Sequence, residues 1–211
     1  MCKKFAYDKL YGILCEYNEK INLTAISGYE DFSVKHIKDS MLGLPYVSGK
    51  VLDIGSGAGF PALVLKNEKP ELDITMLDSV RKKVNYLNYI IETFGLEKIR
   101  AVHARIEDLP ELEKYDTVTA RAVAKLAVLA EYALPFLKIG GSFVAYKSTG
   151  CEDEINEAKP AIKLLGGSIE AVNDLPLNDE ITRRIIIIRK NGHTPKGYPR
   201  KGNKPRISPI A

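Results

Sequence analysis

The chain has 211 residues, of which 45% are hydrophobic and 27% charged, and its formal net charge is +4. These values are typical of one globular domain with a full core, and no apolar run is long enough to span a bilayer. The first residues, MCKKFAYDKLYG, lack the apolar core of a signal peptide, so we expect a cytoplasmic protein, and the three widely spaced cysteines indicate neither a disulfide framework nor a zinc site.

Two helices are expected in the first part of the chain. Apolar residues recur at helical spacing over 5–21, and a second helix is expected over 29–42. Pro45, Ser48 and Gly49 then interrupt the pattern. We therefore treat residues 1–48 as an N-terminal helical extension.

Strands and helices alternate through the middle of the chain. Strands are expected at 50–54, 72–78, 99–104, 115–120 and 140–147, and a closing strand pair at 168–175 and 183–190. Helices are expected from about residue 61 and over 79–95, 125–134 and 152–165. This order predicts an α/β, Rossmann-like fold with a mostly parallel, doubly wound sheet over 49–191, followed by a basic tail over 192–211, in one compact unit.

The stretch VLDIGSGAGFPALVLK, residues 51–66, places Gly55, Gly57 and Gly59 at alternate positions after a predicted strand. Such glycines permit a tight turn or a close approach of the backbone to a ligand. A P-loop is excluded because no Gly-Lys-Ser or Gly-Lys-Thr follows. The third glycine also comes one residue too early for the dinucleotide pattern G-x-G-x-x-G.

Two acids favour a positively charged adenosine ligand over a dinucleotide. Asp53 precedes the first glycine by two residues, where a carboxylate would oppose a pyrophosphate. Asp78 ends the next predicted strand, at the distance along the chain where an acid reaches ribose hydroxyls. S-adenosylmethionine carries a sulfonium and an ammonium and no phosphate. The pattern is typical of a class I methyltransferase that uses this cofactor.

Basic residues dominate the end of the chain. From Arg183 onward there are nine Lys or Arg and no Asp or Glu, so the rest of the chain carries five more acids than bases. Basic side chains neutralise phosphates, and an aromatic residue among them can stack on a base. We expect this end of the chain to contact RNA.

Seven segments in order carry a more specific resemblance: NEKINLTAI, KHIKDS, LDIGSGAGFP, LDSVRKK, ARIEDL, TARAVAKL and YPRKGNKP. Together they resemble the bacterial 16S ribosomal RNA guanine-N7 methyltransferases, also called the glucose-inhibited division protein B family. The resemblance implies methylation of guanine N7 in 16S ribosomal RNA, on the free RNA or the assembling small subunit. We expect a monomer that binds no membrane.

The resemblance and the residue patterns together predict roles for individual residues. Cofactor binding is expected at Gly55, Gly57, Phe60, Asp78, Ile106, Glu107 and Arg121. RNA binding is expected at His36, Lys147, Arg184, Tyr198, Arg200 and Lys201. Guanine N7 has a lone pair and no proton, so direct methyl transfer needs no general base. No catalytic residue is assigned, and Arg121 is the one candidate.

Two other functions fit part of this pattern. A nicotinamide-dependent dehydrogenase would bind NADH at the glycine turn, and a non-catalytic RNA-binding protein would bind RNA without transferring a methyl group. We expect His36 to lie on a helix surface or to contact RNA, and His103 to lie on a strand, rather than either to act as a catalytic base.

Overall fold

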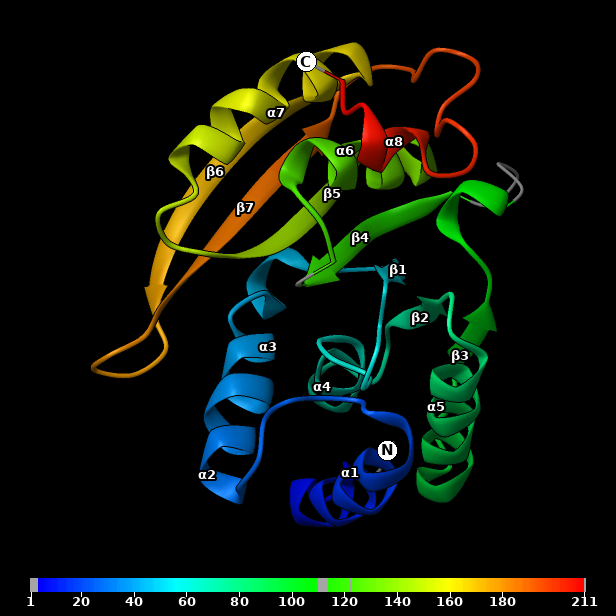
Figure 1. The fold of residues 1–211 in the computed structure, drawn as a ribbon, viewed down its shortest axis with the longest axis vertical. Helices are drawn as coiled ribbons and strands as arrows, with labels where there is room; N and C mark the ends of the chain where they lie inside the picture. The colour runs from blue at the N-terminus through cyan, green and yellow to red at the C-terminus, as the bar shows by residue number, and fades with distance from the viewer. Residues whose placement is uncertain (1–3, 110–113, 122, 211) are drawn as a thin grey trace.

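The computed structural model describes residues 4–109, 114–121 and 123–210. A seven-stranded sheet in the order β3-β2-β1-β4-β5-β7-β6 forms its centre (Figure 1). The strands are β1 (Lys50–Ile54), β2 (Asp73–Asp78), β3 (Ile99–His103), β4 (Tyr115–Arg121), β5 (Leu137–Ser148), β6 (Gly167–Pro176) and β7 (Thr182–Lys190). β1 to β5 pair in parallel, whereas β7 pairs antiparallel with β5 and β6. The expected doubly wound fold is confirmed.

Helices connect the parallel strands as the alternating pattern predicted. They are α1 (Tyr7–Ile21), α2 (Tyr29–Phe32), α3 (Asp39–Met41), α4 (Ala62–Glu68), α5 (Arg81–Phe94), α6 (Leu126–Ala133), α7 (Glu152–Leu164) and α8 (Lys204–Ile207). Short turns complete them: a π-helical turn η1 (Ser33–Lys38) and 3-10 turns η2 (Leu44–Tyr46), η3 (Ile106–Asp108) and η4 (Leu134–Phe136). Where one helix was expected over 29–42, α2, η1 and α3 follow one another. None of the helices in the described part of the chain is long and apolar enough to cross a membrane.

The centre of the sheet is buried on both faces, because its strands alternate side chains between two cores, whereas the edge strand β6 is partly exposed. On β5, Phe143 and Ala145 pack with α6 and α7, while Val144 and Tyr146 face the other side. That second side is covered by α4, α5 and the N-terminal helices. β5 and β7 therefore read as continuous apolar runs, as strands buried on both faces do.

The end of the chain packs against the sheet domain instead of extending from it. In Figure 1 the red α8 lies beside α6. Pro199 and Pro205 are buried, and Arg200 pairs with the buried Glu131 of α6. The sequence predicted a basic tail over 192–211 that contacts RNA, and in the structure a buried carboxylate on α6 gives this segment a fixed attachment.

Candidate active site

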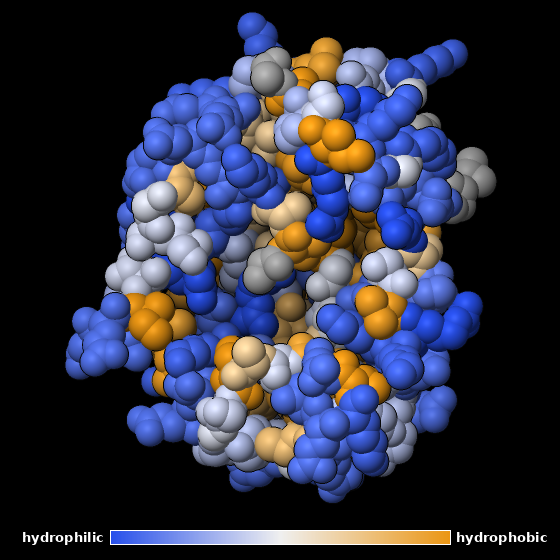
Figure 2. All heavy atoms as spheres, viewed as in Figure 1, coloured by the Kyte–Doolittle hydropathy of each residue, from blue (hydrophilic) through white to orange (hydrophobic). Residues whose placement is uncertain are grey.

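A cavity of about 480 Å³ lies at the carboxyl ends of β1, β2 and β3. This volume suits a small-molecule ligand. Open α/β sheets bind ligands at this edge, where the strand order reverses beside β1. Figure 2 shows the same face hollowed near its middle, with apolar side chains inside the hollow. The cavity is lined by Gly55, Asp78, Ile106 and Glu107, all predicted to bind the cofactor, and also by Val80, Lys83, Arg105, Tyr132, Asn203 and Arg206.

The glycine turn brings its backbone to the cavity wall. Gly55 has φ +71°, a conformation that side chains disfavour, and a Cβ there would lie 2.7 Å from a methyl of Val123. Its amide donates to the carbonyl oxygen of Leu77 at 2.8 Å, which ties the turn to the end of β2. At Gly59 a Cβ would lie 2.3 Å from the Leu63 side chain, so this glycine lets α4 pack closely.

Asp78 is placed by β2 at the cavity wall. One carboxylate oxygen accepts the Gly57 amide at 2.9 Å, and the other accepts the Val80 amide at 2.8 Å. These bonds hold the carboxylate rigidly while it stays 7% exposed. Each oxygen has a second lone pair, so Asp78 can also accept hydroxyl groups from a ligand in the cavity.

Asp53 lies beneath the glycine turn and is fully buried. One of its oxygens accepts the Thr119 hydroxyl at 2.7 Å, and the other has no hydrogen-bond partner among the described residues. Burial raises the pKa of this carboxyl to about 6. An unpartnered carboxylate oxygen beside the turn is consistent with a cationic ligand there, as the sequence predicted for S-adenosylmethionine.

The turn η3 after β3 forms the next part of the wall. Ile106 and Glu107 are both 5% exposed. Arg105 approaches the Glu107 carboxylate at 3.6 Å, and the Lys201 ammonium donates to the Glu107 carbonyl oxygen at 2.6 Å. An apolar side chain can pack on the face of an adenine, and a fixed carboxylate next to it can accept a hydrogen bond from the polar edge. The acceptors of Asp78 and Glu107 and the apolar side chain of Ile106 thus fit an adenosine, and Asp53 beneath the turn suits a cationic group attached to it.

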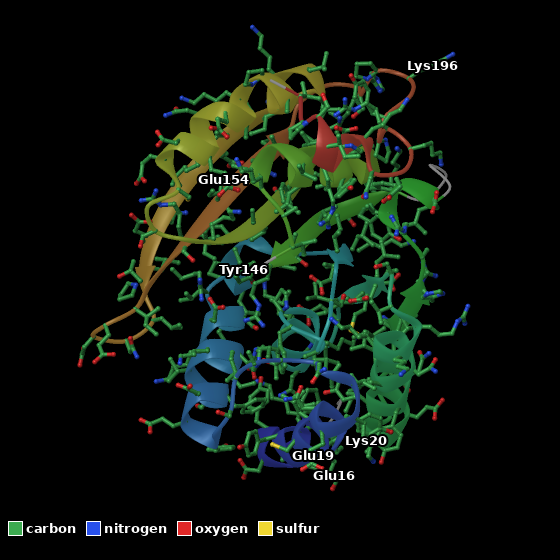
Figure 3. The ribbon with its side chains drawn as sticks, viewed as in Figure 1. Glu16, Glu19, Lys20, Tyr146, Glu154 and Lys196 are labelled. Carbon is green, nitrogen blue, oxygen red and sulfur yellow. The ribbon has the colours of Figure 1, made fainter. Side chains whose placement is uncertain are left out.

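A second cavity of about 720 Å³ lies on the other side of the β4 end. Its walls come from the N-terminal helices, from the ends of β4 and β5, and from the start of α7. Figure 3 labels two of its residues, Tyr146 near the centre and Glu154 on α7. The basic side chains of Lys35, Lys147 and Arg183 also line this cavity.

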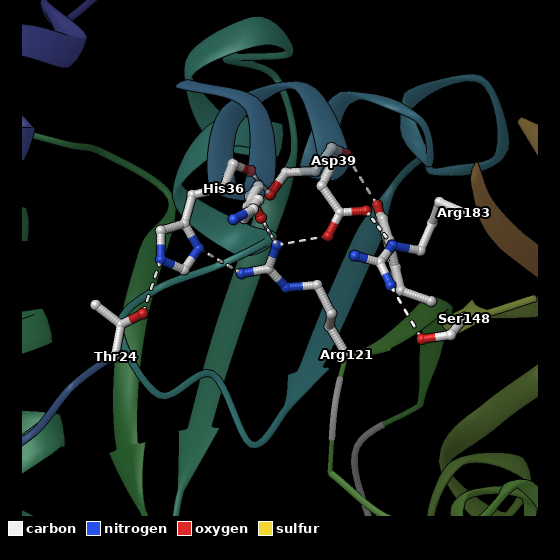
Figure 4. A network of polar contacts seen from close by, with 9 residues as sticks. Thr24, His36, Asp39, Arg121, Ser148 and Arg183 are labelled. Atoms are coloured by element: carbon white, nitrogen blue, oxygen red, sulfur yellow. Dashed lines mark hydrogen bonds and ion pairs between the residues drawn. The ribbon is translucent and has the colours of Figure 1, made fainter. Parts of the chain in front are cut away.

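Arg121 connects β4 to the N-terminal helices across this second cavity (Figure 4). Its guanidinium donates to Asp39 at 2.9 Å, to the Lys35 carbonyl at 3.0 Å and to Nδ1 of His36 at 2.9 Å. Arg183 donates to the other Asp39 oxygen at 2.7 Å. The structure therefore places Arg121 in the second cavity and not among the residues that line the first.

His36 is neutral in this network. Arginine has only donors, so Nδ1 of His36 accepts, and Nε2 carries the proton and donates to the Thr24 hydroxyl at 3.1 Å. Burial, and then the Arg121 charge, lower the pKa of His36 to about 3. The ring stacks on Phe60 with centroids 4.3 Å apart. The expected position on a helix surface was wrong, since His36 is 5% exposed, and RNA contact by His36 stays a prediction.

Phe60 is not among the described residues that line either cavity. Its ring is 4% exposed and also lies 5.6 Å below the Arg121 guanidinium. It was expected to offer apolar surface to the cofactor, but its described contacts are with His36, Phe32 and Arg121. In the structure it supports the residues of the second cavity.

The basic residues predicted to bind RNA have partners within the chain. Arg200 makes two side-chain bonds to Glu131, at 2.9 and 2.7 Å. Arg184 pairs with Asp174 and Glu152, each at 2.6 Å. Lys147 pairs with Glu154 at 2.5 Å in the second cavity, and Tyr198 is half-buried against the core. An RNA contact for these residues stays a prediction.

Several residues of the two cavities were missed by the sequence reasoning. Asp39 and Thr24 complete the Arg121 network, and Asn203 lines the first cavity. Arg183 and Arg206 were expected only as phosphate contacts of the basic end, and their places in the second and first cavities were not predicted. Asp39 had a usable signal, because it lies three residues after His36 and therefore on the same side of a helix. The others come from distant parts of the chain.

Comparisons with known proteins agree with this geometry. Residues 4–184 match the family described as rRNA small subunit methyltransferase G. Two relatives named ribosomal RNA small subunit methyltransferase G are similar over nearly their whole length. The protein of Desulforamulus reducens is 43% identical, covering 98% of this chain and 90% of its own, and that of Acetivibrio thermocellus is 44% identical, covering 99% and 88%.

Two solved structures share this fold at low sequence identity. A methyltransferase from Pyrococcus furiosus aligns with a TM-score of 0.61 at 17% identity, over 88% of this chain and 98% of its own. An S-adenosylmethionine-dependent methyltransferase from Clostridium acetobutylicum aligns with a TM-score of 0.57 at 12% identity, over 86% and 99%. These structures support the fold.

Proposed function

The chain belongs to the rRNA small subunit methyltransferase G family, and from this premise we propose that it methylates N7 of a guanine in 16S ribosomal RNA with S-adenosylmethionine as methyl donor. The observation that carries the proposal is the pair of cavities at one edge of the sheet. The first has fixed acids and a glycine turn suited to a cationic adenosine. The second, beside it, has basic and acidic side chains suited to a nucleotide.

In the first cavity, this chain's residues bind and orient the cofactor. Asp78 accepts ribose hydroxyls, Ile106 and Glu107 hold the adenine, and the turn at Gly55 brings backbone close to the methionine portion. Asp53 contributes negative charge beneath the turn. When bound, S-adenosylmethionine supplies a methyl group that its sulfonium makes electrophilic. The cationic part of S-adenosylmethionine thus lies near acidic residues, and its apolar part lies against apolar side chains.

In the second cavity, the network around Arg121 positions the target nucleotide. Asp39 and His36 hold the Arg121 guanidinium in one orientation, so it meets its ligand without further reorganisation. Lys147 and Arg183 line the same space and can contact phosphate. Because Nδ1 of His36 already accepts a hydrogen bond from Arg121, His36 acts as a positioning residue. No side chain has to remove a proton from guanine N7.

The substrate guanine must be unpaired or flipped out of its helix. In A-form RNA the groove that displays N7 is too deep and narrow for side chains. The second cavity, with a volume of about 720 Å³, has room for such a base. We also propose that the enzyme acts as a monomer in the cytoplasm, since one chain builds both cavities and small subunits assemble there.

The direct test is incubation with tritiated S-adenosylmethionine and 16S ribosomal RNA that lacks the modification, followed by mapping of the labelled base. Label at guanine N7 is expected. RNA binding without label would instead identify a non-catalytic binding protein, and calorimetric binding of NADH would favour a dehydrogenase.

The cofactor site is tested by two variants of one strand. Asp78→Ala removes a carboxylate that makes charge-assisted bonds worth about 1.5–3 kcal/mol, so cofactor binding should weaken about 10- to 150-fold. Asp73→Ala is the matched control, because Asp73 is exposed at the opposite end of β2. Calorimetry should show parental affinity in the control. Equal affinities in both variants would remove Asp78 from the site.

A further inference from the structure

The C-terminal segment, defined here as residues 198–208, forms part of the wall of the cofactor cavity. Asn203 and Arg206 line that cavity together with Asp78 and Glu107. The family model matches residues 4–184, whereas relatives of the same name align over 98% of the chain, so their similarity includes most of this segment. Its place in the structure needs an explanation of its own.

The segment is attached to α6 by a buried ion pair. The Glu131 carboxylate is 1% exposed and accepts both the backbone amide of Arg200, at 2.9 Å, and the Arg200 guanidinium. Arg200 also donates to the Ser208 carbonyl at 2.9 Å, which closes the segment on itself. Leaving a buried carboxylate unpaired is strongly unfavourable, so this attachment fixes where residues 201–206 lie.

From this attachment the segment reaches two parts of the adenosine-binding wall. The Lys201 ammonium donates to the Glu107 carbonyl at 2.6 Å and so fixes the turn η3. Arg206 lines the same cavity as Tyr132 and Glu107, and burial and the Glu107 charge raise the pKa of the Tyr132 hydroxyl there. Arg206, Tyr132 and Glu107 are therefore neighbours in one wall.

We infer that the C-terminal segment is a cofactor-binding element: Asn203 and Arg206 contact the adenosine end of S-adenosylmethionine, and Lys201 positions the turn that carries Glu107. The inference rests on the proposed cofactor site and assigns new residues to it. It also gives a different role to the basic residues that the sequence alone assigned to RNA.

This arrangement predicts that cofactor binding and ordering of the C-terminal segment depend on each other. The segment is held mainly by polar contacts, and only Pro199 and Pro205 of its residues are buried. A segment with few buried apolar contacts opens at low free-energy cost. A ligand that touches the segment only when it is docked will hold it closed.

The test compares cofactor affinity among single variants of the full chain. S-adenosylmethionine and S-adenosylhomocysteine are titrated by calorimetry into the parent, Lys201→Ala and Arg206→Ala. Matched controls are Lys204→Ala, an exposed residue of the same segment, and Lys196→Ala, which extends from the outer edge of the molecule in Figure 3. Each test variant should bind about three- to tenfold more weakly, and each control should match the parent.

Hydrogen exchange provides a second readout. The cofactor should slow exchange of the amides of 198–208 in the parent, and much less in the Lys201→Ala, Arg206→Ala double variant. RNA affinity is measured for the same set of proteins. Parental cofactor affinity in both single variants and in the double variant would overturn the inference, whether or not RNA binding weakens. Failure of the parent to bind either ligand would overturn the proposed cofactor site itself.

Discussion

The two ends of the chain both pack onto the sheet domain, and each completes a different cavity. The N-terminal extension brings His36 and Asp39 to the second cavity, and the C-terminal segment brings Asn203 and Arg206 to the first. Their attachments differ in kind. The N-terminal extension buries apolar side chains in the core: Phe5, Leu10, Leu14, Leu23, Phe32 and Ile37. The C-terminal segment depends on Arg200, Lys201 and two buried prolines.

This difference has a consequence for function. Apolar burial of this extent stabilises a fixed scaffold, whereas a segment held by a few polar contacts can open and close. The cavity proposed for the nucleotide therefore has rigid walls. The cavity proposed for the cofactor has one wall that responds to its ligand.

The largest loss of stability is expected when the apolar attachment of the N-terminal extension is disrupted. Phe32 is 1% exposed and packs against Tyr11, Tyr29, His36 and Phe60. Phe32→Ala should lower the free energy of unfolding by about 3–5 kcal/mol, through lost burial and a cavity. Ile207→Ala is the control in the other region, because Ile207 is 79% exposed and should change stability by less than about 0.5 kcal/mol. Urea denaturation measures both.

The next effect is expected from breaking the polar attachment. Arg200→Ala leaves the Glu131 carboxylate buried and unpaired, which costs about 3 kcal/mol. Faster hydrogen exchange and proteolysis should be confined to 192–210, with the N-terminal helices unchanged. The double variant Arg200→Met, Glu131→Leu should recover most of the loss. An equal increase in hydrogen exchange and proteolysis at both ends of the chain would contradict the proposed difference between the two attachments.

A smaller loss of stability is expected at acidic pH, and it arises from His36 in the N-terminal extension. The folded-state pKa of His36 is lowered to about 3, so the unfolded chain binds this proton more readily. The contribution of neutral His36 is therefore complete above about pH 6.5 and is lost as the pH falls. Between pH 6.5 and 5 the parent should lose about 2 kcal/mol more than His36→Gln. Asp53 is present in both proteins, so its raised pKa, which acts on stability in the opposite direction, does not change the difference between them.

The smallest effect is expected from an exposed ion pair of the N-terminal extension. Lys35 and Asp31 pair at 2.8 Å with side chains 38% and 45% exposed. Such pairs contribute at most about 0.5 kcal/mol, so Asp31→Ala should barely change the urea midpoint. A loss above about 1 kcal/mol would mean that polar contacts also hold this extension.

The sequence was sufficient to predict the sheet and one cavity. Strand and helix periods, which depend on neighbours a few residues apart, predicted the alternation and the closing strand pair. The glycine turn and Asp78 could be recognised because they follow strands directly, and the ends of parallel strands meet at one edge. Gly55, Asp78, Ile106 and Glu107 accordingly lie together in the structure.

Only the tertiary structure decided which partner each charged residue has. Arg121 meets His36 across 85 positions of the chain, and Arg200 meets Glu131 across 69. A count of nine bases near the C-terminus predicted RNA contact, but it contained no information about a buried carboxylate on α6. The pairing of a charge depends on its distance to other charges and on its burial, and both are set by the packing of elements that are far apart in the sequence.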